Sequence, residues 1–150
     1  MKRNRFVFLF LLFSFAACNN NDKQAPGKAE DDIDAAREFI RSALDGKFGQ
    51  ARTYLLSDSI NVQYLDAVER NYQRQPADTI NAYREASINI HEVKPVNDST
   101  TIVIYSNSFK NDHDTLKVLR VKGQWLIDLK YLFEHDMDTT RIFNNRDSIK

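Results

Sequence analysis

The chain contains a single cysteine, Cys18, and the position of this thiol suggests what chemistry it undergoes. Cys18 follows a basic N-terminus and the apolar run of residues 6–17, a layout typical of an export signal. The run is shorter than the roughly 20 apolar residues that span a bilayer. A buried N-terminal helix does not fit either, because the run is apolar on every face and directly follows a basic cluster. A free thiol is a poor choice in an exported protein. We therefore expect the Cys18 thiol to be modified.

The residues Phe15-Ala16-Ala17-Cys18 resemble the lipobox of bacterial lipoproteins, which usually reads Leu, a small residue, Gly or Ala, then Cys. In that family the thiol receives a diacylglyceryl group, and signal peptidase II cuts before the cysteine. The resemblance implies a signal peptide over residues 1–17, peptidase recognition through Phe15, Ala16 and Ala17, and lipid attachment at Cys18. Phe15 stands where the family usually has Leu. Two or three acyl chains anchor a protein stably, so the expected partner is the membrane.

Residues 18–30 are predicted to be the lipidated cysteine and a flexible tether, because they lack an apolar anchor and contain Pro26-Gly27. Twelve such residues reach about 20 Å, which would hold the folded part near the membrane. In Gram-negative lipoproteins an Asp after the cysteine can signal inner-membrane retention. Asn19 occupies that place, so the resemblance favours the outer membrane of the cell envelope over the inner one.

The charge balance argues against a nucleic-acid partner. Three of the 21 basic residues lie in residues 1–17, which leaves 18 basic against 21 acidic side chains and a net charge of −3. Binding to DNA or RNA calls for a basic face. We therefore expect no nucleic acid among the partners.

The three histidines, His91, His113 and His135, do not form a recognisable metal-binding pattern. A protein metal site needs three or four converging ligands at typical spacings, and no such set is present. Serine nucleophile elbows, phosphate-binding loops and zinc-protease helices are also absent from the sequence. We expect no metal and no cofactor.

Apolar residues at helical spacing predict three helices, at about residues 31–46, 48–56 and 58–76. Asp31 and Asp32 lie at the positive end of the first helix, Ser57 or Asp58 is a suitable cap of the third, and Gly46 and Pro76 are suitable stops. Residues 77–86 are ambiguous, with a helical turn favoured over a loop.

From residue 87 the apolar period becomes two, which predicts strands at residues 87–96, 100–109, 114–122 and 124–129. The turns Asn97-Asp98, Asn111-Asp112 and Lys122-Gly123 suit hairpins. Helices and strands in separate blocks predict an α+β fold, with three N-terminal helices packed on a curved four-stranded antiparallel sheet over residues 31–132. Residues 133–150 are predicted to be a polar tail.

The stretches AREFIRSALDGKFGQARTYL and LKVLRVKGQWLIDL resemble small bacterial lipoproteins of unknown function with a nuclear transport factor 2-like (cystatin-like) domain. Members pack helices into the hollow of a curved sheet and form a cone. The resemblance implies a fold and no activity. Candidate residues for the cavity of such a cone are Tyr54, Tyr64, Tyr72 and His91. The competing interpretation is that the tyrosines pack in the core and at its rim, with their hydroxyls reaching water. The spacing of residues in the sequence does not place a general base beside a partner, as an enzyme would need.

Hairpin registers predict which residues share a face of the sheet. If Lys122-Gly123 is a two-residue loop, Trp125 faces Arg120 and Ile127 faces Val118. If Asn111-Asp112 is another, Tyr105 joins that face beside Val118. The opposite face is then also apolar and has a Lys117–Asp128 pair beside it. Its apolar residues are Ile102, Ile104, Leu119, Val121 and Leu126.

Three helices normally cover only one face of a sheet, so a second apolar face needs a cover of its own. A homodimer through this outer face is the simplest arrangement. The alternative is that residues 130–150 fold back over it.

From the sequence we expect a membrane-anchored cell-envelope lipoprotein that acts as a non-enzymatic binding or interaction module. The alternative is a small-ligand binder or an enzyme that uses the cavity of the cone. A binding module predicts a tightly filled apolar interior, whereas an enzyme predicts an open cavity with a polar pair, such as His91 or an Asp beside a Tyr.

Overall fold

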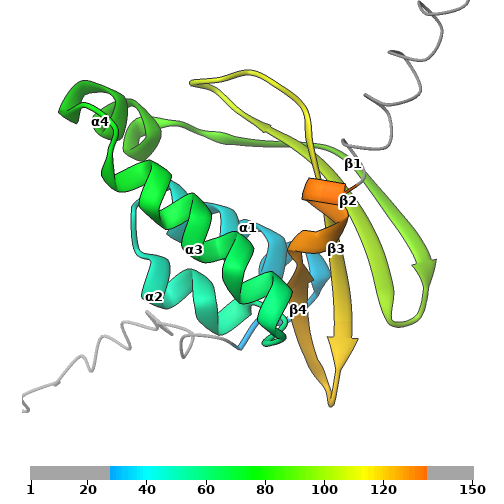
Figure 1. Cartoon of the computed structure of the whole chain (residues 1–150). Helices are drawn as coiled ribbons and strands as arrows, with labels where there is room; N and C mark the ends of the chain where they lie inside the picture. Colours follow the sequence, from blue (N-terminus) through cyan, green and yellow to red (C-terminus); the bar gives the residue numbers. More distant parts are fainter. Residues whose placement is uncertain (1–27, 135–150) are drawn as a thin grey trace, which may run out of the picture.

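Four α-helices precede a four-stranded antiparallel sheet in the part of the chain that the computed structural model describes, residues 28–134 (Figure 1). The predicted α+β class is confirmed. The helices are α1 (Asp32–Leu44), α2 (Phe48–Ala51), α3 (Ser59–Gln73) and α4 (Ala77–Glu85), with a 3-10 turn, η1 (Arg52–Tyr54), after α2. The strands are β1 (Ile88–Asn97), β2 (Thr100–Asn107), β3 (Asp114–Val121) and β4 (Gln124–Asp128).

An aspartate caps the start of each of the two long helices, and the Asp58 cap is the one that the sequence predicted. The Asp31 side chain accepts a hydrogen bond from the Asp34 N–H at the start of α1. The Asp58 side chain accepts from the N–H groups of Ile60 and Asn61 at the start of α3. Such caps satisfy backbone donors that have no partner inside the helix, which is why both helices begin where the sequence indicated.

The prediction of three helices is corrected by α4, which is a full helix where the sequence was ambiguous. None of the α4 side chains is fully buried, so its sequence shows only a weak helical pattern of apolar residues. The C-terminal end of α4 is held by Arg41 of α1. The Arg41 guanidinium donates to the carbonyl oxygens of Ala86, Arg84 and Tyr83 at 2.8, 3.1 and 3.3 Å. A cation is favourable at a helix C-terminus. Arg41 is 45 residues from Ala86, so the local sequence could not reveal this support.

The strands follow each other in the order β1-β2-β3-β4. The β3–β4 hairpin has the predicted register, with Arg120 opposite Trp125 and Val118 opposite Ile127. Its two loop residues, Lys122 and Gly123, have φ values of 50° and 81°. Positive φ at both positions is the geometry of the turn that suits the twist of a hairpin.

The predicted register of the β2–β3 hairpin is wrong. Tyr105 lies opposite Asp114, not beside Val118. The cause is Asn107, whose side chain accepts hydrogen bonds from the N–H groups of Phe109 and Lys110 and so starts a wider loop than Asn111-Asp112 alone. The slip from position 118 to 114 is an even number of residues, so Tyr105 stays on the predicted inner face.

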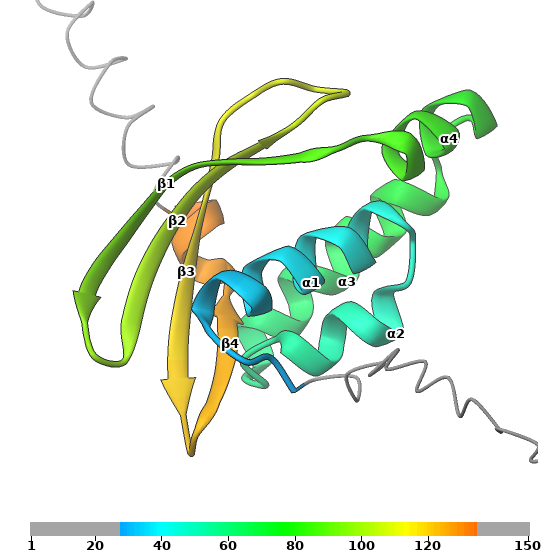
Figure 2. The ribbon, with the colours of Figure 1, turned by 180° about the vertical axis from the view of Figure 1, so that it is seen from behind.

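The helices cover the inner face of the sheet, and α1 contacts all four strands (Figures 1 and 2). The Thr101 hydroxyl on β2 also donates to the Asp32 carboxylate at the start of α1. The predicted outer-face residues do share the opposite face: the four other than Val121 are half-buried, and Val121 is exposed. The predicted Lys117–Asp128 pair is present, with 3.8 Å between the Lys117 ammonium and the carboxylate.

Residues 129–134, after β4, are helical and pack with the helices. The ring of Phe133 stacks on Tyr64 of α3 at 4.6 Å between centroids. The packed domain therefore includes Phe133, although the sequence analysis placed the end of the domain at residue 132. The remainder of the predicted tail lies outside the described residues.

Candidate ligand cavity

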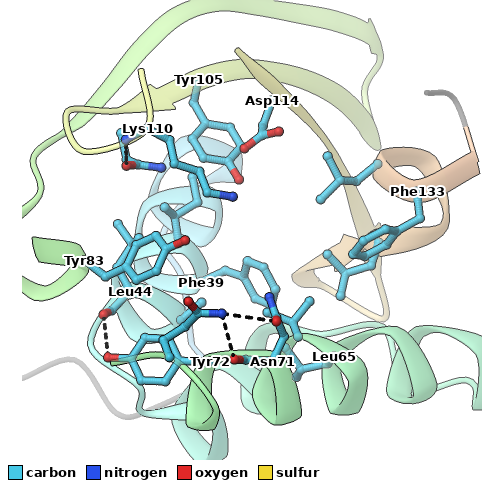
Figure 3. A pocket seen from close by; sticks show the side chains of 17 residues that line it. Phe39, Leu44, Leu65, Asn71, Tyr72, Tyr83, Tyr105, Lys110, Asp114 and Phe133 are labelled. Atoms are coloured by element: carbon cyan, nitrogen blue, oxygen red, sulfur yellow. Dashed lines mark hydrogen bonds between the residues drawn. The ribbon is translucent and has the colours of Figure 1, made fainter. Parts of the chain in front are cut away.

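A cavity of about 400 Å³ lies between α1, α3 and the inner face of the sheet (Figure 3). This volume is within the range of small-molecule sites. Its walls are mainly apolar and come from Phe39, Ile40, Ala43, Leu44, Leu65, Val68, Leu129, Leu132 and Phe133. Polar groups line it at the β2–β3 end and along one side of α3.

One end of α3 is held to the end of β4 by the fully buried amide of Asn61. Its Nδ2 donates to the carboxylates of Asp58 and Asp128 at 2.8 and 3.2 Å. Its Oδ1 accepts from the Leu129 N–H at 2.6 Å. A buried amide with all these partners satisfied fixes the distance between helix and strand.

The other end of α3 is held to the end of α1 by Tyr72. The Tyr72 hydroxyl donates to the Leu44 carbonyl oxygen at 3.2 Å. The Tyr72 ring also lies against Gly46, where an added Cβ would come within 2.7 Å of the ring. Both ends of α3 are therefore fixed, and Leu65 and Val68 between them line the cavity.

The contact at the Asn61 end of α3 includes an ion pair between Asp58 and Lys130. Hydrogen bonds from the Asn61 backbone N–H and from the Lys130 ammonium lower the pKa of Asp58 from 3.8 to about 2. The Lys130 ammonium lies 3.0 Å from the Asp58 carboxylate, and this hydrogen bond raises the pKa of Lys130. The pair is therefore ionised at neutral pH.

At the β2–β3 end, Tyr105 and Asp114 lie opposite each other on adjacent strands and both line the cavity. The Tyr105 side chain is buried, and Asp114 is half-buried. Burial raises the pKa of the Tyr105 phenol, and the Asp114 carboxylate raises it further through its charge and a side-chain hydrogen bond. Figure 3 shows Asp114 beside the Tyr105 ring, with Lys110 entering the same part of the cavity.

Two tyrosines form an aromatic side of the cavity. The rings of Tyr72 and Tyr83 lie 6.0 Å apart between centroids. Tyr72 also meets the buried Phe48 edge to face at 5.4 Å, and Tyr83 meets the exposed Phe109 at 5.0 Å. Such rings offer a planar apolar surface with hydroxyls at their edges.

Of the four predicted cavity residues, only Tyr72 lines this cavity. Tyr54 is buried in the core with 1% of its surface exposed. Tyr64 stacks on Phe133 beside the cavity. His91 is exposed, and its Nε2 lies 2.8 Å from the Ser106 hydroxyl. His91 sits at a bulge of β1, which breaks the alternation of inward and outward side chains, so the sequence could not place it.

Asp114, Lys110 and Phe133 are cavity residues that the sequence did not predict. Asp114 was placed at the start of a predicted strand, and Phe133 was assigned to the tail. Tyr105 was placed on the inner face, but its partner there depends on the β2–β3 register. Only the loop started by Asn107 brings Asp114 opposite Tyr105.

The histidines that the structure describes do not make a metal centre. The rings of His91 and His113 stack at 4.1 Å between centroids. Over residues 28–134, no group of three or more His, Cys, Asp or Glu side chains could hold a metal ion.

The predicted lipid site, Cys18, and the peptidase recognition residues Phe15, Ala16 and Ala17 lie outside the described residues. Among the helices within residues 28–134, none is long and apolar enough to span a membrane.

The chain is similar to a solved NTF-2 like protein of unknown function from Shewanella oneidensis MR-1. The two share 14% sequence identity with a TM-score of 0.47, and the match covers 63% of this chain and 89% of the other. The sequence resemblance named the same fold family. No protein-family model matches the chain, and no curated protein matches it at a significant level. The function therefore has to be argued from the cavity.

Proposed function

We propose that the protein binds a small, largely apolar ligand in its cavity while a lipid on Cys18 holds it at the cell envelope. The observation that supports binding is the cavity of about 400 Å³, with apolar walls and one polar end. Small-molecule sites combine these features: the walls bury most of the ligand, and a few polar groups orient it.

The size and lining of this cavity favour ligand binding over a module that works only through its surface. Val68, Tyr72 and Phe133 line its walls and are only partly buried. An apolar ligand would remove their exposed surface from water, which contributes about 25 cal/mol for each Å² of apolar surface.

Filling the cavity tests this proposal. We expect Val68→Phe to weaken binding of the fluorescent probe N-phenyl-1-naphthylamine by about tenfold or more, because the larger ring occupies the ligand's space. Val68 lines the cavity, whereas the neighbouring Ala67 is exposed. Ala67→Phe is therefore the matched control and should bind as the original protein does.

The measurement is the probe's fluorescence as a function of protein concentration, with the melting temperature of each variant recorded beside it. Equal probe affinities for folded Val68→Phe and Ala67→Phe would contradict binding in the cavity.

We also propose that the outer sheet face pairs with a second copy of the chain. Half-buried aliphatic side chains on that face support this, because each would gain free energy from further burial. The segment that could cover the face instead, residues 130–150, packs with the helices as far as the structure describes it.

A further inference from the structure

We infer that the ligand enters the cavity through an opening between α4 and the β2–β3 loop, residues 108–113, and that α4 is a lid over this opening. The contact between the rings of Tyr83 and Phe109 keeps the lid closed. This inference rests on the proposed function, because it names how entry to the same cavity is controlled.

The cavity opens to solvent between the C-terminal half of α3 and the β2–β3 loop. Of the described residues that line it, Asn71 on α3 and Lys110 in the loop are exposed, whereas the others are buried or half-buried. A side chain can both line a cavity and meet bulk water only where the cavity reaches the surface. Figure 3 shows the Tyr83 ring between Lys110 and Tyr72 on one side of the cavity. Tyr83 of α4 therefore lies at the rim of the opening.

An aromatic contact joins α4 to the loop at this rim. The rings of Tyr83 and Phe109 meet edge to face, with 5.0 Å between their centroids. Tyr83 lines the cavity, but Phe109 lies outside the lining and is 44% exposed. Phe109 is therefore on the solvent side of Tyr83 and is not a wall of the ligand site. An edge-to-face pair is favourable but weak, which suits a contact that opens and closes repeatedly.

The helix α4 is the side of the opening that can move. None of its side chains is fully buried, so little packing opposes its displacement. Pro76 and Ala86, which flank the helix, have extended backbone conformations, with ψ values of 153° and 134°. Arg41 holds the C-terminal end of α4 through backbone carbonyl oxygens alone, by hydrogen bonds that a long side chain can break and remake.

The loop is the fixed side of the opening. The Asn107 side chain accepts hydrogen bonds from the N–H groups of Phe109 and Lys110 at 3.2 and 3.0 Å. The Asn107 carbonyl oxygen accepts another from the Asn111 N–H at 2.8 Å. Phe109 is therefore a fixed stop against which Tyr83 closes. When the two rings separate, α4 can move away from the loop, and the cavity opens beside Lys110.

The test measures how fast N-phenyl-1-naphthylamine enters and leaves the purified protein, by stopped-flow fluorescence. We expect Phe109→Ala to raise both the association and the dissociation rate constant by about threefold to tenfold, because the closed lid loses its aromatic contact. The dissociation constant should change by about twofold or less, since Phe109 lies outside the lining and both rate constants rise together.

Two variants serve as controls. Phe109→Tyr keeps the ring and should keep the rate constants of the original protein. Val96→Ala also truncates an exposed apolar side chain, since Val96 is 62% exposed at the end of β1, at the opposite end of the sheet from the loop. It should change neither rate constant. Hydrogen exchange reports on the lid itself, because the amides of α4 should exchange faster in Phe109→Ala while those of α1 keep their rates.

The outcomes separate this inference from the proposed function. Unchanged rate constants, or unchanged exchange of α4, in Phe109→Ala would overturn the lid and leave ligand binding in place. A weaker affinity with an unchanged association rate constant would also overturn it, because Phe109 would then be part of the binding wall. If the original protein does not bind the probe, both the inference and the proposed function fail.

Discussion

Asn61 is a fully buried amide within α3, and its partners show why it is there. Its oxygen accepts from the backbone N–H groups of Leu129 and Lys130, which follow the last strand and have left the sheet ladder. Its nitrogen donates to Asp58 and Asp128. A buried polar group without partners costs about 1–3 kcal/mol, so this one side chain satisfies the backbone and sets the height of the helix above the strand.

The Asp58 carboxylate makes this tie dependent on pH. Its pKa is lowered from 3.8 to about 2 by the Asn61 N–H and the Lys130 ammonium. A lowered carboxylate pKa means that the stability it contributes is present above pH 3.8 and is lost as the pH falls through about 2. We expect Asp58→Asn to lower the free energy of unfolding at pH 7 and to flatten its fall between pH 4 and pH 2.

The measurement is urea unfolding followed by circular dichroism at several pH values. Asp112→Asn is the control, because Asp112 is an exposed loop carboxylate. Parallel pH profiles for Asp58→Asn and the original protein would refute the assignment.

At the scale of elements, the joint between α1 and α2 supports the cavity through Gly46. Gly46 has a φ of +75°, which side chains other than glycine rarely adopt. Its missing side chain also leaves room for the Tyr72 ring at the far end of α3. The same glycine thus ends α1 and permits the contact that holds α3.

A pair of glycine substitutions tests this joint. We expect Gly46→Ala to lower the free energy of unfolding by about 1–3 kcal/mol, through the positive φ and the clash with Tyr72. Gly49, inside α2, has nothing within 4 Å of an added Cβ. Gly49→Ala should therefore leave stability unchanged or raise it by up to about 1 kcal/mol.

Unfolding midpoints in urea compare the two variants under identical conditions. Similar midpoints for Gly46→Ala and Gly49→Ala would count against a structural role of the joint. Because Tyr72 lines the cavity, Gly46→Ala should also weaken binding of N-phenyl-1-naphthylamine.

For the whole molecule, the outer sheet face is the feature that predicts association. We expect light scattering to show a mass that rises towards the dimer with concentration, because Ile104, Leu119 and Leu126 are only half-buried in one copy. Leu119→Lys should keep the protein monomeric by placing a charge in the interface.

Ile60→Lys is the control for the loss of an apolar side chain, since Ile60 is exposed on α3 and not on the sheet. A strict monomer at high concentration would contradict self-association.

Attachment to the membrane is also a property of the whole molecule, and it depends on Cys18. We expect Cys18→Ala to move the protein out of the membrane fraction and to remove the mass of the acyl chains. Asn21→Ala, in the tether, should change neither. Fractionation with mass spectrometry provides the check, and an unaltered mass and membrane location of Cys18→Ala would disprove the lipoprotein interpretation.

The sequence by itself determined the features that depend on neighbouring residues. Asp31 and Asp58 cap helices, and Lys122-Gly123 closes a hairpin, because each acts within a few residues. The order of helices and strands and the α+β class follow from the same local patterns. The even slip at the β2–β3 loop kept Tyr105 on its predicted face although its predicted neighbour was wrong.

Only the tertiary structure decided the cavity and its polar end. Asn61 meets Leu129 across 68 residues, and Arg41 supports α4 across 45. The pairing of Tyr105 with Asp114 depends on how the Asn107 side chain shapes a loop, and the position of His91 depends on a bulge. Such contacts form only when helices and strands pack against each other. Residues that are distant in the sequence then meet, and the local sequence pattern contains no signal for these meetings.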